Sequence, residues 1–313
     1  MTTGSRHQLR GFSLLEIAIV LAILGFVLTI GLKSTGAYLS AERRQTTVAR
    51  LAGIDAALVN YVALQKRLPC PADGASTQGA AFFGVERRDN VTGLCAIDPG
   101  PPVTPFMNRG VVPWVTLGIS EAEALDGWNN RITYRTVSAA NGFTNNNALD
   151  MTRCATNGTE DEQVPAAAPI PKTACNANCS VANLTLCTKP TDFLLNRGIV
   201  VQNGAGVVIM DRLPTPYAPP FPLPSAPTAA AFLLISHGEN RGGAYSSSGV
   251  IQVASPANSA LENINNNNRV FQAFYVDAPQ VDADSPTHFD DILLRPTLMS
   301  VITRAQLGPR KVQ

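Results

Sequence analysis

The chain has 313 residues, of which 24 are basic and 23 are acidic, and charged residues make up only 15% of it. This nearly balanced charge gives no reason to expect a nucleic-acid partner. The length is enough for one large or two small domains. Beyond residue 68 the composition is rich in Asn, Pro, Thr, Ser and Ala, which favours a β-rich domain outside the cytoplasm.

An apolar run opens the chain. Residues 12–32 contain a single charged side chain, Glu16. As a helix this run would be ~31 Å long, close to the ~30 Å hydrocarbon core of a bilayer. Arg6 and Arg10 precede it, and basic residues stay on the cytoplasmic side. The sequence therefore predicts a single-pass membrane protein with a cytoplasmic N-terminus, in which the carboxylate of Glu16 needs a partner.

Three interpretations of this segment compete. A secretory signal peptide has a shorter apolar core and a small-residue cleavage site, and no such site precedes Lys33. A plain signal anchor fits the length but leaves Glu16 unexplained. The stretch Arg-Gly-Phe-Ser-Leu-Leu-Glu at residues 10–16 closely resembles the processing motif of type IV prepilins and type II secretion pseudopilins.

This resemblance implies that prepilin peptidase cuts between Gly11 and Phe12 and methylates the new N-terminus at Phe12. Residues 1–11 are then a leader peptide. Glu16 becomes the fifth residue of the mature chain and can pair with the Phe12 amine of a neighbouring subunit during assembly. The alternative is that Glu16 lies near enough to the membrane interface for its carboxylate to reach water.

The second half of the N-terminal helix is predicted over residues 33–68. No proline occurs between Ser34 and Leu68, and apolar residues recur there at helical spacing. These apolar positions are Val48, Leu51, Ile54, Leu58, Tyr61, Val62 and Leu64. Pro69 and Pro71 end the helix. The predicted fold is α+β, with a helix that is membrane-spanning over 12–32 and amphipathic over 33–68, packed on an antiparallel β-sheet domain at 69–313.

Six cysteines follow the membrane segment, in a compartment that should be oxidising. They are Cys70, Cys95, Cys154, Cys175, Cys179 and Cys187. Six cysteines allow 15 pairings, among which proximity favours Cys70–Cys95. The other four lie in a predicted insertion at 141–190 that is poor in large apolar residues. Structural disulfides are favoured over a zinc site because this cluster holds no histidine.

The globular part reads as short apolar segments between turns. We predict short strands at 82–85 and 288–294, apolar elements at 199–201 and 207–209 on either side of a Gly-rich turn, a strand or short helix at 229–236, and a last apolar segment at 297–302. Ser120 and Glu123 have the spacing of a capping box.

A tight turn is predicted at residues 126–130, Asp-Gly-Trp-Asn-Asn, ahead of an alternating strand. It resembles the pseudopilin core signature Asp-x-Trp-Gly-Asn. Asn129 stands where glycine is usual, and asparagine tolerates the left-handed backbone conformation. We interpret Asp126 and Trp128 as turn and packing residues, because folding alone explains them.

The sequence offers residues for two kinds of site chemistry. Ser236, His237 and Asp290 could form a hydrolase triad, but no Gly-x-Ser-x-Gly elbow is present. A C-terminal acidic group, foremost Asp290 and Asp291, is a candidate for calcium, which some major pseudopilins bind in a C-terminal loop. The acidic group also includes Asp277, Asp282 and Asp284. No EF-hand spacing occurs, so a solvated acidic turn is the alternative, and no other cofactor is expected.

The predicted function is structural: a minor pilin or pseudopilin of a type IV pilus or a type II secretion pseudopilus. The resemblance implies an inner-membrane precursor with a periplasmic C-terminal domain, whose partners are prepilin peptidase, other pilins or pseudopilins, and the membrane. The alternatives are a pilus-tip adhesin that binds a surface or ligand through the cysteine-rich insertion, and a membrane-anchored periplasmic enzyme.

Overall fold

The computed structural model describes residues 13–89, 95, 110–137, 142–144, 149, 197–212, 228–252, 260–266, 274–281 and 288–307, without the side chains of 27–37. Gly11 and Phe12 lie outside the described residues, as does nearly all of the predicted insertion with its four cysteines. The chain divides into two compact units, Met1–Arg44 and Gln45–Gln313.

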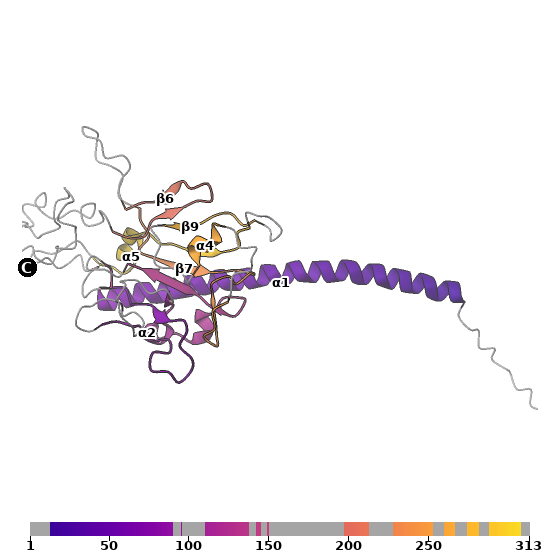
Figure 1. Ribbon diagram of the computed structural model, residues 1–313, viewed down its shortest axis with the longest axis horizontal. Coiled ribbons are helices and arrows are strands. Elements are labelled where there is room, and N and C mark those ends of the chain that lie inside the picture. The colour runs from indigo at the N-terminus through magenta and orange to yellow at the C-terminus, as the bar shows by residue number, and fades with distance from the viewer. Residues whose placement is uncertain are drawn as a thin grey trace, which may run out of the picture. The chain divides into compact units, whose positions relative to one another are not determined.

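The first element is α1 (Leu14–Gln65), a helix of 52 residues (Figure 1). Within the globular unit, Leu51, Ile54, Leu58 and Val62 are fully or almost fully buried. Their spacing of three and four residues places them on one helix face, so the amphipathic pattern is confirmed here.

Two predicted apolar positions lie off this buried face. Val48 is 54% exposed and Leu64 is 79% exposed. The helix ends at Gln65, slightly before the predicted limit at Leu68. Lys66 takes a left-handed conformation with φ 58°, and its N–H still bonds to the carbonyl of Val62 at 2.8 Å. A left-handed residue at this point ends a helix before any proline is reached.

The main sheet has five antiparallel strands in the order β1-β2-β4-β7-β10. The strands are β1 (Ala72–Asp73), β2 (Gly110–Val111), β4 (Thr133–Thr136), β7 (Phe232–Ser236) and β10 (Ile292–Leu294). All five residues of β7 are buried. Phe232 and Leu234 belong to the core that includes α1, whereas Leu233 and Ile235 belong to a second core. The sheet is therefore covered on both faces at β7, an inner strand whose first four residues are all apolar.

The second core lies against a three-stranded sheet in the order β6-β5-β9. Its strands are β5 (Val201–Gln202), β6 (Val208–Met210) and β9 (Tyr275–Val276). The apolar elements predicted at 199–201 and 207–209 form a hairpin, in which β5 and β6 pair antiparallel. The pairing of β5 with β9 is parallel, which the sequence did not predict. A further pair joins β3 (Asn130–Arg131) to β8 (Tyr245–Ser246).

Short helices complete the described part of the globular unit. They are α2 (Trp114–Leu117), the 3-10 helix η1 (Glu121–Ala124), α4 (Glu262–Asn265) and α5 (Leu298–Arg304). The capping box is confirmed: Ser120 Oγ accepts from the N–H of Glu123, whose carboxylate accepts from the N–H of Ser120. The predicted α+β class, with a long N-terminal helix and antiparallel sheet, is confirmed.

The predicted strand at 82–85 is wrong. The N–H of Phe83 bonds to the carbonyl of Ala80 and that of Val85 to Phe82, so the segment forms turns. The ring of Phe83 packs edge-on against Trp114 with 5.0 Å between ring centroids. Side-chain packing on a neighbouring ring satisfies these apolar residues without strand pairing.

Candidate functional site

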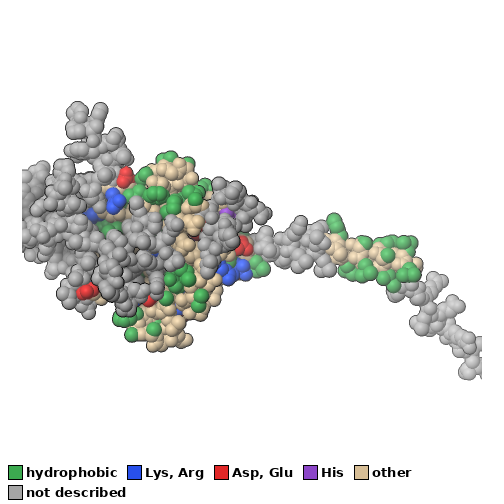
Figure 2. Space-filling model, viewed as in Figure 1, with side chains coloured by type: hydrophobic (Ala, Val, Ile, Leu, Met, Phe, Trp, Pro, Cys, Tyr) green, Lys and Arg blue, Asp and Glu red, His purple; other side chains and the backbone are tan. Residues whose placement is uncertain are grey.

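The described start of α1 is apolar on every side. Nine large hydrophobic side chains between Leu14 and Phe26 are each 47–88% exposed within this chain. Figure 2 shows hydrophobic side chains gathered around this end of the helix. Ser13 caps it, because its Oγ accepts from the N–H of Leu15 at 3.3 Å. Glu16 lies in the first turn, where the helix dipole favours a negative charge.

Two stretches of α1 are relevant to membrane insertion. Among the described residues, Tyr38–Gln65 is long and apolar enough to cross a bilayer, with a mean hydropathy of 1.3, but 39% of its most apolar window is buried. Its buried side chains, such as Leu51 and Leu58, belong to the core of the globular unit. The exposed apolar stretch Leu14–Phe26 is shorter than a full span over the described side chains. Its exposure makes it the better candidate for lipid contact.

Cys70 and Cys95, the pair that proximity favours, form a disulfide with 5.3 Å between their Cα atoms. Beside it, the carboxylate of Glu86 accepts from both Nη atoms of Arg67, from the Tyr61 hydroxyl and from the backbone N–H of Cys70. Burial alone would raise the pKa of Glu86, but the hydrogen bonds from Arg67 and Cys70 outweigh it and hold the pKa below its usual range. This cluster joins the end of α1 to the disulfide loop.

The turn at 126–130 has the structure that the sequence predicts. Oδ1 of Asp126 accepts from the N–H groups of Trp128 and Asn130, both at 2.9 Å. Asn129 takes the left-handed conformation with φ 66°. Burial raises the pKa of Asp126, against the opposing effect of these hydrogen bonds. Asp126 is thus a buried structural acceptor.

The hydrolase triad does not form. Ser236 Oγ donates to Asp126 Oδ2 at 2.7 Å, and His237 Nε2 bonds to Thr133 Oγ1 at 2.9 Å. Oδ2 of Asp290 accepts two backbone N–H groups instead of orienting His237. Ser236 and His237 are each 1% exposed, so a substrate has no access to them.

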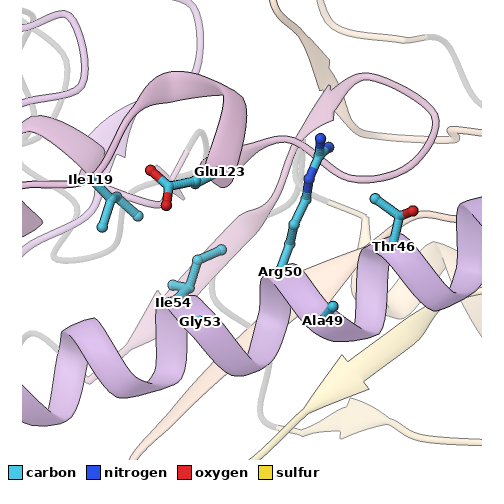
Figure 3. A pocket seen from close by; sticks show the side chains of 7 residues that line it. All are labelled: Thr46, Ala49, Arg50, Gly53, Ile54, Ile119 and Glu123. Atoms are coloured by element: carbon cyan, nitrogen blue, oxygen red, sulfur yellow. The ribbon is translucent and has the colours of Figure 1, made fainter.

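A pocket of about 380 Å³ lies between α1 and the segment that carries η1 (Figure 3). Its lining is Thr46, Ala49, Arg50, Gly53, Ile54, Ile119 and Glu123. Arg50 Nη1 donates to the carbonyls of Leu125 and Asp126, and Glu123 is engaged in the capping box. Both charged side chains of the lining are therefore engaged in contacts that hold the fold together.

A second polar cluster was not predicted from the sequence. Glu262 of α4, His288 and Asp290 bring their ligand atoms within 4.8 Å of one another, and all three are buried. Burial raises the pKa of Glu262 to about 7, with further increases from the charges of Asp291 and Asp290. The one signal in the sequence is that His288 and Asp290 lie two residues apart in an extended segment, which places their side chains on the same face.

The acidic residues considered for calcium do not converge on one point in the described part of the chain. Asp290 lies with Glu262 and His288, whereas Asp291 accepts from Asn265 at 2.8 Å and is not part of that group of three. Asp277 pairs with Arg295 at 2.6 Å. Asp282 and Asp284 lie outside the described residues. A calcium site at Asp290 and Asp291 therefore stays a prediction.

Residues 6–32 match the family described as the prokaryotic N-terminal methylation motif. The chain carries the prepilin-type signature of type IV pilins and pseudopilins. The match covers residues 6–11 of the predicted leader, the cleavage position, Glu16 and the apolar run. Neither the comparison with curated proteins nor the comparison with solved structures gave a match.

Proposed function

We propose that this chain is a structural subunit, a minor pilin or pseudopilin, of a type IV pilus or a type II secretion pseudopilus. The observation that carries the proposal is the methylation motif at 6–32 combined with the nine exposed apolar side chains between Leu14 and Phe26. Each such side chain gains roughly 1.5–3 kcal/mol when it is fully buried. A helix of this kind needs a covering, first by lipid and then by neighbouring subunits.

Processing is the first step of the proposed role. Prepilin peptidase removes residues 1–11 and methylates Phe12, which leaves a chain anchored once in the inner membrane with its globular unit in the periplasm. The test is N-terminal mass spectrometry of the protein from cells with and without the peptidase. A methylated Phe12 that depends on the peptidase is expected. An intact Met1, or a cut beyond Leu32, would refute the proposal.

A variant at the cleavage position sharpens this test. Gly11→Leu places a bulky side chain next to the bond that is cut, so the precursor should persist with its leader attached. Gly4→Leu, in the same leader but away from the cut, is the matched control and should be processed normally. Equal processing of both variants would place the cut elsewhere.

Glu16 is proposed to bring subunits into register. Cleavage creates an amine near the start of the helix, and a carboxylate in apolar surroundings is stabilised by an opposite charge. Glu16→Ala should leave membrane insertion and cleavage intact but reduce the amount of assembled filament severely. Glu42→Ala, which removes the next acidic side chain along the chain, is the control and should assemble. Normal filaments from Glu16→Ala would refute the pairing.

A further inference from the structure

The buried cluster of Glu262, His288 and Asp290 has the arrangement of a metal site. His288 Nε2 lies 3.5 Å from Glu262 Oε1 and 3.6 Å from Asp290 Oδ2. The side chains of His288, Glu262 and Asp290 are 8%, 2% and 4% exposed. Two residues apart in an extended segment, His288 and Asp290 point to the same side, and Glu262 of α4 faces them.

The ring orientation of His288 is fixed from outside the cluster. Its Nδ1 lies 2.9 Å from the carbonyl oxygen of Val281. A carbonyl can only accept, so Nδ1 carries the hydrogen and Nε2 of the neutral ring presents a lone pair to the two carboxylates. Histidines that bind metals are commonly held in this way through their other ring nitrogen.

The carboxylates are also held in place by donors outside the triad. Glu262 Oε2 accepts from Asn240 Nδ2, and Asp290 Oδ2 accepts from the N–H groups of Glu239 and Asn240. The second oxygen of Asp290, Oδ1, is buried and has no hydrogen-bond partner among the described residues. A buried carboxylate oxygen without a donor is costly, and the charge of a cation bound to this carboxylate would reduce that cost.

We propose that Glu262, His288 and Asp290 bind one divalent transition-metal ion of the zinc type. Zinc bonds of ~2.0–2.1 Å in a tetrahedral site separate the ligand atoms by roughly 3.3–3.4 Å, close to the 3.5 and 3.6 Å between His288 Nε2 and the two carboxylate oxygens. Calcium is the poorer fit, because it prefers six to eight oxygen ligands at longer distances and this set includes an imidazole nitrogen.

Such an ion would have a structural role. Glu262 lies on α4, while His288 and Asp290 directly precede β10, and the turn at 237–240 is tied to both through Asp290 and Glu262. The ion would therefore cross-link two segments that are distant in the sequence, and the turn at 237–240 is hydrogen-bonded to both of them. Three protein ligands leave the fourth position of a tetrahedral zinc ion for a water molecule.

The test uses the full-length chain in detergent, stripped with a chelator and re-equilibrated with zinc. We expect about one zinc ion per chain by elemental analysis and a midpoint of thermal unfolding raised by roughly 5–10 °C. Calcium at the same concentration should not reproduce the shift. Unchanged unfolding with zinc would overturn the proposal.

Variants assign the ion to this cluster. Glu262→Gln and His288→Gln preserve side-chain size and should lose the bound zinc and the thermal shift. Asp277→Asn, which breaks the ion pair with Arg295 outside the cluster, is the control and should keep both. Zinc retained by Glu262→Gln would belong to another site, such as the cysteines at 154–187, and would refute the assignment.

Cobalt substitution tests the ligands in the unaltered chain, which covers the case in which a variant does not fold. Cobalt bound by imidazole and carboxylates gives weak visible bands without intense thiolate-to-cobalt absorption in the near ultraviolet. Strong thiolate absorption, or no visible bands at all, would overturn the proposed ligand set.

Discussion

Glu86 is the most heavily used acceptor near the disulfide, so Glu86→Gln tests how the end of α1 is held. In the structure Oε1 accepts from the Tyr61 hydroxyl at 3.0 Å and from Arg67 Nη2 at 2.8 Å. Oε2 accepts from Arg67 Nη1 and from the N–H of Cys70, both at 2.9 Å. Glutamine keeps the shape but turns one acceptor into a donor that faces other donors.

The expected loss of stability follows from the burial of the ion pair between Arg67 and Glu86. The side chains of Arg67 and Glu86 are 9% and 16% exposed, and loss of one partner from a buried pair costs ~3–5 kcal/mol. Because the pair is not completely buried, we expect Glu86→Gln to lower the free energy of unfolding by about 3 kcal/mol. Asp277→Asn is the control, since its ion pair with Arg295 is about one-third exposed and should contribute at most ~1 kcal/mol.

The assay is urea unfolding of the full-length chain in detergent, followed by tryptophan fluorescence. The midpoint for Glu86→Gln should fall well below that of Asp277→Asn at an unchanged denaturant slope. If the two variants unfold at the same urea concentration, the buried ion pair between Arg67 and Glu86 does not stabilise the fold as argued.

The same variant predicts a pH dependence. Hydrogen bonds to Arg67 and Cys70 hold the pKa of Glu86 below its usual range, despite burial, so its contribution is fully present above the unfolded-state pKa of about 4.3. That contribution is lost as the pH falls through the lower folded-state pKa. The stability difference between wild type and Glu86→Gln should therefore be constant from about pH 6 to pH 8 and shrink below about pH 4. A difference that stays the same at pH 3 would contradict the lowered pKa.

Three further substitutions test the fold. Asp126→Ala should lower the free energy of unfolding by about 3–4 kcal/mol, because the carboxylate accepts three hydrogen bonds in a buried turn. Asp126→Asn should lower it by about half as much, and equal losses in urea unfolding would contradict this. Cys95→Ser removes the disulfide that closes a loop with a sequence separation of 25 residues, and it should lower the free energy of unfolding by about 3 kcal/mol. An unchanged thermal midpoint would refute a stabilising disulfide. Gly84→Ala would push a Cβ into the ring of Trp114 and should lower the free energy of unfolding by more than about 3 kcal/mol. Gly79→Ala meets no atom within 4 Å and should cost only the backbone strain of about 1–2 kcal/mol.

The elements that could be predicted are those with a strong local signal. The spacing of Leu51, Ile54, Leu58 and Val62 identifies the buried face of α1, because residues on one face of a helix recur every three to four positions. The capping box at Ser120 and the turn at Asp126 were equally local, since each depends on contacts within four residues.

Elements that depend on distant partners could not be predicted in the same way. Phe82–Val85 resembles a strand in isolation, but Phe83 packs on the ring of Trp114, which lies 31 residues further along the chain. The parallel pairing of β5 with β9 likewise joins Val201 to Tyr275. Local patterns do not specify which segments meet.

The buried cluster of Glu262, His288 and Asp290 shows the same limit for a site. Glu262 lies in a short polar helix whose sequence has no apolar periodicity that would fix its direction. Its position depends on Asn265, which exchanges two hydrogen bonds with the backbone of Val276 in β9. A polar side chain placed by tertiary contacts gives no signal of its function in a single sequence.

The polar residues at the end of β7 explain why these contacts are specific. Ser236 and His237 follow four buried apolar residues of the strand, and each finds its partner on a distant segment: Asp126 for Ser236, and Thr133 for His237. Each bond adds only ~0.5–1.5 kcal/mol net, but a buried polar group left without a partner costs ~1–3 kcal/mol. The apolar part of β7 therefore accounts for the layers of the fold, since any apolar neighbour would cover it. The polar end restricts which segments can meet there. His237 Nδ1 also lies 3.6 Å from Oδ1 of Asp291, the residue just before β10, so this end of β7 helps to position the segment that carries the proposed metal site.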